Sequence, residues 1–309
     1  MDLSFNLCPL HPSGLRLNNP VLVASGTFGY GTEFAELVDI KQIGAIVCKG
    51  TTLEPRPGNH QPRLYETAGG LLNSIGLQNI GVEAVIREKA PIWADWPVPV
   101  IVNIAGETVE EYGKLAQLLD SVRGVSALEV NISCPNVQRG GQEFGSDPRQ
   151  AAEVTRVVKT STSLPVIVKL TPNVSDIVSI ARAVAQAGAE ALTLVNTLRG
   201  MAIDVERYRP VLGGITGGLS GPALKPVALA MVYAVYREVK IPLIGCGGIY
   251  SVSDALEFFL AGAQAVQIGS ATFINPATAT KVAGDLEQWM KKRGIARLAD
   301  VVGAAHHRT

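Results

Sequence analysis

Residues 165–195 read PVIVKLTPNVSDIVSIARAVAQAGAEALTLV, which is one complete repeat of the main pattern in this chain. A short β-branched run over 165–170 is followed by a helical pattern over 174–187 and a second apolar run over 191–195. The turn Ala187-Gly188-Ala189 is typical of a helix ending that leads into a strand. The order strand, helix, strand predicts a βαβ unit with parallel strands.

The same alternation continues in both directions along the chain. Further strands are expected at 21–25, 45–49, 98–104, 127–132, 243–245 and 265–268. Further helices are expected at 108–120, 147–160, 225–239, 251–261 and 276–293, the second and last of them opening on Asp147-Pro148 and Asn275-Pro276. Eight strand candidates favour a closed α/β barrel, the (β/α)8 TIM barrel, over an open sheet.

The length of the chain fits one such barrel with insertions. A TIM barrel typically needs about 250 residues, and this chain has 309 without a linker-like stretch. We therefore expect residues 1–309 to form a single barrel domain with long loops at its C-terminal face, chiefly 50–96 and 196–225. The run Ser25-Gly26-Thr27-Phe28-Gly29-Tyr30-Gly31 does not have the G-x-G-x-x-G spacing of a dinucleotide-binding sheet.

Composition excludes several classes of function. Hydrophobic residues make up 47% of the chain, while Lys+Arg and Asp+Glu both number 27, so no global field attracts nucleic acid or an acidic membrane. The N-terminus lacks a signal-peptide pattern and the apolar runs are too short to span a bilayer, which predicts a cytoplasmic protein. The four cysteines form no CxxC pair and no HExxH motif is present, so neither a metal site nor an iron–sulfur cluster is expected on this chain.

Polar side chains gather at the ends of five successive strand candidates. They are Lys49, Asn103, Asn131, Lys169 and Asn196, each placed among Val, Ile, Leu and Ala. A polar group in such surroundings needs a partner to offset its desolvation. One residue of this kind is explained by a capped loop carbonyl, but five on one rim favour a shared polar ligand.

Two glycine turns follow the last two strand candidates. They are Gly245-Cys246-Gly247-Gly248-Ile249 and Gly269-Ser270-Ala271. In TIM barrels the loops after strands seven and eight commonly hold a phosphate on backbone N–H groups and a helix N-terminus. Tight turn geometry alone explains either turn by itself, whereas both together favour a phosphate-bearing cofactor, which Ser25-Gly26 could line from the other side.

Cys134 lies where the fourth strand candidate breaks, in Asn131-Ile132-Ser133-Cys134-Pro135-Asn136. A thiol at a barrel mouth can be reactive, but a buried structural thiol is the usual state of a lone cysteine. Cys48 and Cys246 also lie near strand ends, so position alone leaves the choice open. The histidines are in Pro-rich loops or near the C-terminus, so a Cys–His nucleophile pair is poorly supported.

Across nearly its whole length the chain resembles the dihydroorotate dehydrogenase family. The matching segments are Ala24-Ser25-Gly26, Lys49-Gly50-Thr51, Asn73-Ser74-Ile75-Gly76-Leu77, Asn131–Asn136, Val168-Lys169-Leu170, Asn196-Thr197, Gly218-Leu219-Ser220-Gly221, Gly247-Gly248 and Gly269-Ser270. The resemblance implies one FMN per chain, in contact with Ser25, Lys49, Gly50, Asn103, Asn131, Lys169, Val195, Gly221, Gly247, Gly248, Gly269 and Ser270. It also implies a substrate site formed by Lys49, Asn73, Ser74, Ile75, Gly76, Leu77, Asn131, Asn136, Asn196 and Thr197.

The resemblance further implies the reaction and its catalytic base. Family members oxidise (S)-dihydroorotate to orotate in pyrimidine biosynthesis, and the cytosolic members use a cysteine at the position of Cys134 as the base. Lys169 would stabilise negative charge on the reduced flavin. Serine replaces that cysteine in the membrane-linked members, which also carry an N-terminal membrane extension.

Within the family, the segments 73–79 and 196–204 look like the NAD-linked branch, class 1B. In that branch a homodimer of this chain pairs with an electron-transfer subunit that carries FAD and a [2Fe-2S] cluster, giving a heterotetramer. The alternative is the fumarate-linked branch, class 1A, which is a homodimer without a partner. Two other readings are a different barrel enzyme, such as another flavin oxidoreductase, a cysteine-nucleophile nucleotide dehydrogenase or a phosphate-binding lyase, and a non-catalytic scaffold.

Overall fold

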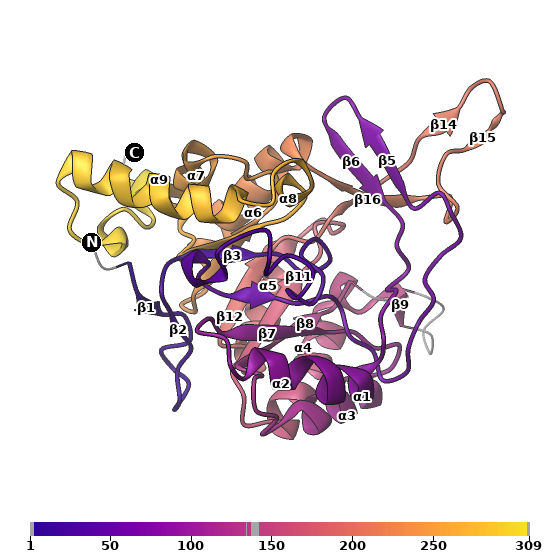
Figure 1. Ribbon diagram of the computed structural model, residues 1–309, viewed down its shortest axis with the longest axis horizontal. Helices are drawn as coiled ribbons and strands as arrows, with labels where there is room; N and C mark the ends of the chain where they lie inside the picture. The colour runs from indigo at the N-terminus through magenta and orange to yellow at the C-terminus, as the bar shows by residue number, and fades with distance from the viewer. Residues whose placement is uncertain (1–2, 134, 137–141, 308–309) are drawn as a thin grey trace.

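Eight parallel strands close into a barrel in the computed structural model, which describes residues 3–133, 135–136 and 142–307 (Figure 1). In order around the barrel they are β3 (Val21–Val23), β4 (Ile46–Val47), β7 (Val100–Ile104), β8 (Ala127–Asn131), β11 (Val166–Leu170), β12 (Ala191–Leu194), β17 (Leu243–Cys246) and β18 (Ala265–Ile268). β18 pairs with β3 and closes the ring. The prediction of a (β/α)8 barrel is confirmed, and each of the eight strands lies at or close to its expected place.

Helices cover the outside of the barrel between successive strands. They are α1 (Val82–Ala84), the π-helical turn η2 (Val85–Lys89), α2 (Ala90–Trp93), α3 (Val109–Leu119), α4 (Pro148–Ser161), α5 (Ile177–Gln186), α6 (Lys225–Tyr236), α7 (Val252–Ala261), α8 (Ala271–Ile274) and α9 (Thr278–Arg293). Short 3-10 turns are η1 (Ile40–Gln42), η4 (Phe144–Ser146), η5 (Pro222–Leu224), η6 (Leu298–Asp300) and η7 (Ala304–His307). Side-chain caps fix the starts of α3, α4, α5 and α7. In α4, for example, Asp147 accepts from two backbone N–H groups.

Two helix starts differ from the expectation by more than one residue. The helix expected from Val174 begins at Ile177, because Asp176 caps it. The last long helix was expected from Pro276, but α9 begins at Thr278. The short helix α8 ends just before Asn275, whose side-chain oxygen accepts a 3.0 Å hydrogen bond from the backbone N–H of Ala277. This local turn uses the backbone of residues 275–277, so the helix cannot start earlier.

A hairpin outside the eight strands closes the lower, N-terminal end of the barrel. β1 (Phe5–Asn6) pairs with β2 (Arg16–Leu17) in an antiparallel register. Leu7, Leu15 and Leu17 are buried and form one cluster with the lowest inward-facing barrel residues, Leu22, Ala45, Val47, Ile101, Ala127, Ile167, Ala191, Ile244 and Ala265. The hairpin therefore acts as an apolar plug, which completes the lower barrel core.

The two long connections on the C-terminal face pair with each other. Strands β5 (Leu64–Thr67), β6 (Gly70–Asn73), β13 (Leu198–Gly200) and β16 (Gly217–Ser220) form a four-stranded antiparallel sheet in the order β13-β16-β6-β5. From the same region β14 (Ile203–Asp204) and β15 (Arg209–Pro210) project as a two-stranded arm (Figure 1). A small pair, β9 (Pro135–Asn136) and β10 (Gln142–Glu143), follows β8. Long irregular loops were expected here, and the sheet organises much of both.

Among the described residues, no helix combines the length and hydrophobicity that a bilayer crossing requires. Within the same residues, no cluster of three or more His, Cys, Asp or Glu side chains is suited to a metal ion.

Candidate active site

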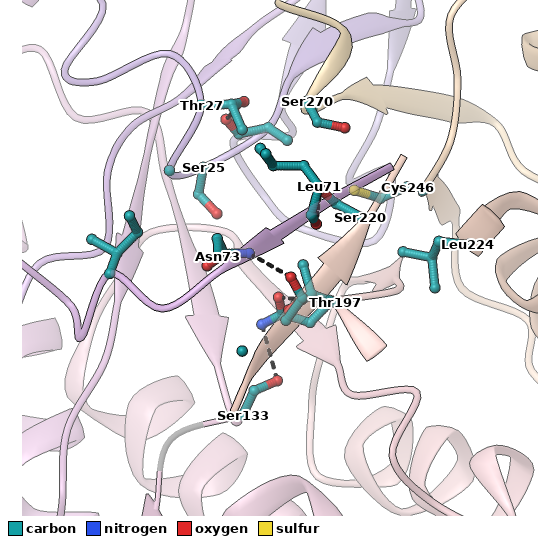
Figure 2. A pocket seen from close by; sticks show the side chains of 18 of the residues that line it. Ser25, Thr27, Leu71, Asn73, Ser133, Thr197, Ser220, Leu224, Cys246 and Ser270 are labelled. Atoms are coloured by element: carbon teal, nitrogen blue, oxygen red, sulfur yellow. Dashed lines mark hydrogen bonds between the residues drawn. The ribbon is translucent and has the colours of Figure 1, made fainter. Parts of the chain in front are cut away.

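A cavity of about 560 Å³ lies between the C-terminal ends of the barrel strands and the four-stranded sheet. Its lower wall comes from residues at or just after the strand ends, such as Lys49, Asn103 and Asn131. Its upper wall comes from β6 and β16, which contribute Asn73 and Ser220 among others (Figure 2). The volume is in the range of pockets that enclose a small-molecule ligand.

The cavity brings together almost all the residues that the sequence singled out. It is lined by Ser25, Lys49, Gly50, Asn73, Ser74, Ile75, Gly76, Leu77, Asn103, Asn131, Lys169, Val195, Asn196, Thr197, Gly221, Gly247, Gly248, Gly269 and Ser270. Two candidates cannot be placed in this way. Cys134 lies outside the described residues, and Asn136 is described only as part of β9.

Lys169 forms the charged floor of the cavity. Its side chain is 5% exposed, and its ammonium nitrogen lies 3.8 Å from Glu129 Oε1 and 3.4 Å from Ser25 Oγ. Burial by itself lowers the pKa of this ammonium group, but the net pKa is raised above its usual value, chiefly by the negative charge of Glu129. Lys169 is therefore a buried cation at neutral pH, suited to an anionic or electron-rich ligand.

Glycine turns form the end of the cavity beside β17 and β18. Gly247 and Gly248 have φ values of +134° and +69°, in the region that favours glycine. A Cβ on Gly248 would lie 2.8 Å from the carbonyl oxygen of Gly221. Within the part of the chain that the structure describes, no protein acceptor takes the backbone N–H groups of Gly247, Gly248 or Ser270. These free donors, together with the Ser270 hydroxyl, can bind a phosphate.

Asparagine and serine side chains form a connected wall below the sheet. Asn196 Nδ2 donates to Asn131 Oδ1 at 3.2 Å. It also donates to Ser133 Oγ at 3.0 Å, a bond that Figure 2 draws as the dashed line ending at Ser133. On the opposite wall, Asn73 Nδ2 donates to the carbonyl oxygen of Gly218 at 3.0 Å, which ties β6 to β16. Asn196 and Asn131 are thus held in one orientation, and an amide presents both a donor and an acceptor to a planar polar ring.

Lys49 is the second cation of the cavity and differs from Lys169. It is half-buried, and burial together with the nearby charge of Arg63 lowers its pKa, although Glu33 acts in the opposite direction. No hydrogen-bond acceptor for its ammonium group is found among residues 3–133, 135–136 and 142–307. Lys49 is available to bind a carboxylate.

The described cysteines do not compete for the role of a base. Burial raises the pKa of Cys48 to about 12, and burial also raises that of Cys246, although Lys169 lowers it. Both thiols therefore stay protonated near neutral pH. Cys8 lies in the plug at the other end of the barrel.

Sequence reasoning missed the polar layer under the cavity floor. Glu129, Thr193 and Gln267 are all fully buried inside the barrel, on β8, β12 and β18. The signal was present, because alternation along 127–131 puts Ala127, Glu129 and Asn131 on one face of the strand. Only Asn131 was read in that way, and its neighbour two residues earlier was overlooked.

The comparisons with known proteins agree on one family. The sequence model of the dihydroorotate dehydrogenase family matches residues 10–290. The chain belongs to the dihydroorotate dehydrogenase family. It is similar to proteins named dihydroorotate dehydrogenase B (NAD(+)), catalytic subunit, with 57% identity in Pelobacter propionicus (98% of each chain covered) and 59% in Desulforamulus reducens (94% of this chain, 96% of the relative). The relative of the same name in Desulforudis audaxviator is 57% identical, over 95% of this chain and 96% of its own.

As a member of this family the chain has the architecture that its sequence predicted, and the barrel confirms it. The roles of individual side chains in the cavity stay predictions.

Proposed function

We propose that this chain oxidises (S)-dihydroorotate to orotate in the de novo synthesis of pyrimidines, as an FMN-dependent, NAD-linked dihydroorotate dehydrogenase formed from a single barrel domain over residues 1–309. One observation carries the proposal: a single cavity collects Lys49, Lys169 and the Asn131–Asn196 pair beside two glycine turns. The names of the relatives support the same reaction.

The residues present fit FMN. The free N–H groups of Gly247, Gly248 and Ser270 suit its phosphate, and Lys169 suits the electron-rich edge of its ring. The set that we assign to the cofactor is completed by Ser25, Lys49, Gly50, Asn103, Asn131, Val195, Gly221 and Gly269, of which Lys49 and Asn131 also face the substrate. When bound, FMN supplies the acceptor for a hydride from the substrate.

The remaining lining residues fit a small anionic ring. We assign the substrate carboxylate to Lys49 and the ring amides to Asn73, Asn131, Asn196 and Thr197, with the loop of Ser74, Ile75, Gly76 and Leu77 enclosing them. The resemblance to the family adds Asn136 to this set. Dihydroorotate must lose a hydride from one ring carbon and a proton from the neighbouring carbon. We assign the proton to the Cys134 thiolate, because the resemblance implies a cysteine base at this position. The raised pKa values of Cys48 and Cys246 agree with this choice.

We further propose that electrons leave through a partner. The relatives are named catalytic subunits of NAD(+) enzymes, which supports a separate subunit that carries FAD and a [2Fe-2S] cluster and reduces NAD. The proposed assembly is a heterotetramer built on a homodimer of this chain. Turnover of the isolated chain with fumarate, together with a dimer of this chain alone on size exclusion of native extract, would instead support the class 1A alternative.

The role of Cys134 is tested by anaerobic mixing of the FMN-loaded chain with dihydroorotate. General base catalysis typically contributes about 10²–10⁴-fold, so Cys134→Ala should slow flavin bleaching by that factor while FMN stays bound. Cys8→Ala is the matched control, because Cys8 lies at the opposite end of the barrel and its loss should leave bleaching unchanged. Equally fast bleaching in Cys134→Ala would remove Cys134 from the mechanism.

A further inference from the structure

Glu129 is a fully buried carboxylate at the centre of a polar layer inside the barrel. Asn103 Nδ2 donates to its Oε1 at 2.8 Å. Thr193 Oγ1 and Gln267 Nε2 donate to its Oε2 at 2.8 and 2.7 Å. Both oxygens are therefore hydrogen-bonded, and four strands, β7, β8, β12 and β18, fix the position of this one charge.

The counter-charge of this carboxylate is Lys169. Lys169 Nζ lies 3.8 Å from Glu129 Oε1, 3.5 Å from Gln267 Oε1 and 3.4 Å from Ser25 Oγ. These three distances are long for hydrogen bonds of an ammonium group, which usually measure about 2.7–2.9 Å to a charged acceptor. Lys169 is thus held by charge and by a ring of weak contacts, and its N–H donors remain available on the cavity side.

Lys169 and Glu129 lie at different depths in the barrel, and this difference suggests a role for Glu129. Lys169, Asn103 and Ser25 line the cavity, whereas Glu129, Thr193 and Gln267 do not and lie directly below its floor. A buried ion pair is weak evidence for a purely stabilising function, because desolvation of the two charges offsets much of their attraction. A layer that only filled the barrel could be apolar, as the layer below it is.

We propose that Glu129 is a positioning residue, which holds the charged ammonium group of Lys169 at the floor of the cavity so that this charge acts on the bound FMN. The inference rests on the proposed FMN site. Glu129 does not touch the ligand and acts through Lys169. Burial alone favours a neutral Lys169, and the carboxylate is what reverses that tendency, which agrees with the raised pKa of the lysine.

The test is the midpoint potential of bound FMN, measured at one mildly alkaline pH in the wild type, Glu129→Gln, Lys169→Met and the double variant. Without the carboxylate, the Lys169 side chain should either become deprotonated or move away from the cavity floor. In both cases reduced FMN loses a nearby cation. We expect the affinity for reduced relative to oxidised FMN to fall at least about tenfold in Glu129→Gln, which lowers a two-electron potential by about 30 mV. Lys169→Met and the double variant should show the same potential as each other.

Thr193→Val is the matched control. It removes one hydrogen bond to Glu129 but keeps the carboxylate, so it should change stability while leaving the potential near that of the wild type. A merely structural polar layer would make Thr193→Val and Glu129→Gln behave alike.

Several outcomes would overturn the inference. An unchanged or higher potential in Glu129→Gln would show that Lys169 keeps its charge without Glu129. If Glu129→Gln does not fold, Lys169→Met is compared with the double variant, in which both buried charges are removed. Different midpoint potentials in these two variants would show that Glu129 acts independently of Lys169. Failure of the wild type to bind FMN would contradict the proposed function itself, which is a different result from FMN bound at an unchanged potential.

Discussion

The lower and upper halves of the barrel interior are built from the same strands but differ in character. On β7, Ile101 belongs to the plugged lower core and Asn103 lines the cavity, and on β11 the same holds for Ile167 and Lys169. Side chains two residues apart on a strand point to the same face, so only depth separates each pair. The β1–β2 hairpin seals the lower half, while the sheet β13-β16-β6-β5 leaves a cavity above the upper half. Depth in the barrel therefore separates residues packed in the apolar core from residues that line the cavity and that we propose to bind the ligands.

The largest expected effect is on the plug. Leu17 is fully buried in the lower core, and truncation of a buried leucine to alanine typically costs about 2–5 kcal/mol. Leu17→Ala should lower the free energy of unfolding by that amount in a denaturant titration, while the affinity of the folded protein for FMN stays unchanged. Leu10→Ala, in the same hairpin but 73% exposed, should have little effect. Weaker FMN binding in Leu17→Ala would mean that the two halves are not independent.

A smaller effect, on FMN binding rather than on stability, is expected at the glycine turn. Ala at position 248 would adopt an unfavourable φ near +69° and bring its Cβ to 2.8 Å from the carbonyl oxygen of Gly221. Strain of this type costs about 1–3 kcal/mol, so Gly248→Ala should raise the Kd for FMN by about tenfold or more in a fluorescence titration. Gly284→Ala in α9 is the control, because a Cβ there meets nothing within 4 Å, and it should leave FMN binding unaltered.

The pH dependence of the two halves should also differ. Burial, followed by the charge of Glu190, raises the pKa of Cys8 in the plug from 9.0 to about 12. Between these values the unfolded chain loses the thiol proton and the folded chain keeps it, so stability falls as pH rises from about 9 toward 12. The slope for one such thiol is at most about 1.4 kcal/mol per pH unit. In Cys8→Ala the free energy of unfolding should fall less steeply between about pH 9 and 12, by up to this slope. The same pH dependence in wild type and variant would contradict a raised pKa for Cys8.

Activity should respond to pH in the opposite direction. A Cys134 thiol with an unperturbed pKa near 8.5 becomes a better base as pH rises toward that value. The rate of anaerobic flavin bleaching should therefore increase on the alkaline side of neutrality, in the range where stability has not yet begun to fall. A rate that is flat through pH 8.5 would indicate another base or a strongly shifted thiol.

The eight barrel strands could be predicted because each is a short, largely apolar run, and most of them are followed by a helical pattern with clear end signals. The plug could not, because β1 and β2 are only two residues long and show no periodicity. The sheet above the cavity was missed for a related reason. β16 reads GGLS, a poor strand sequence, and it pairs with β6 across about half of the chain.

Residues that line the cavity could be singled out from the sequence where a residue type was unusual for its surroundings. Lys49 and Lys169 stand out in apolar runs, and the glycine turns recur after the last two strands. Glu129 was not recognised, although alternation puts it on the same face of the strand as Asn131, because the sequence alone does not show that this face is enclosed. Only the closed barrel, which puts Glu129 beside Gln267 from the last strand, shows that it is buried.

The comparison of the two halves is tested most directly on one strand, with Ile167→Val and Lys169→Met. Ile167→Val should cost about 0.5–1.5 kcal/mol of stability and leave both the Kd and the midpoint potential of FMN at their wild-type values. Lys169→Met should lower the midpoint potential and weaken FMN binding in a protein that remains folded. The account would be contradicted if both substitutions changed the Kd and midpoint potential of FMN equally, or if Lys169→Met changed neither. Either result would mean that the ligand site does not start at the depth of Lys169.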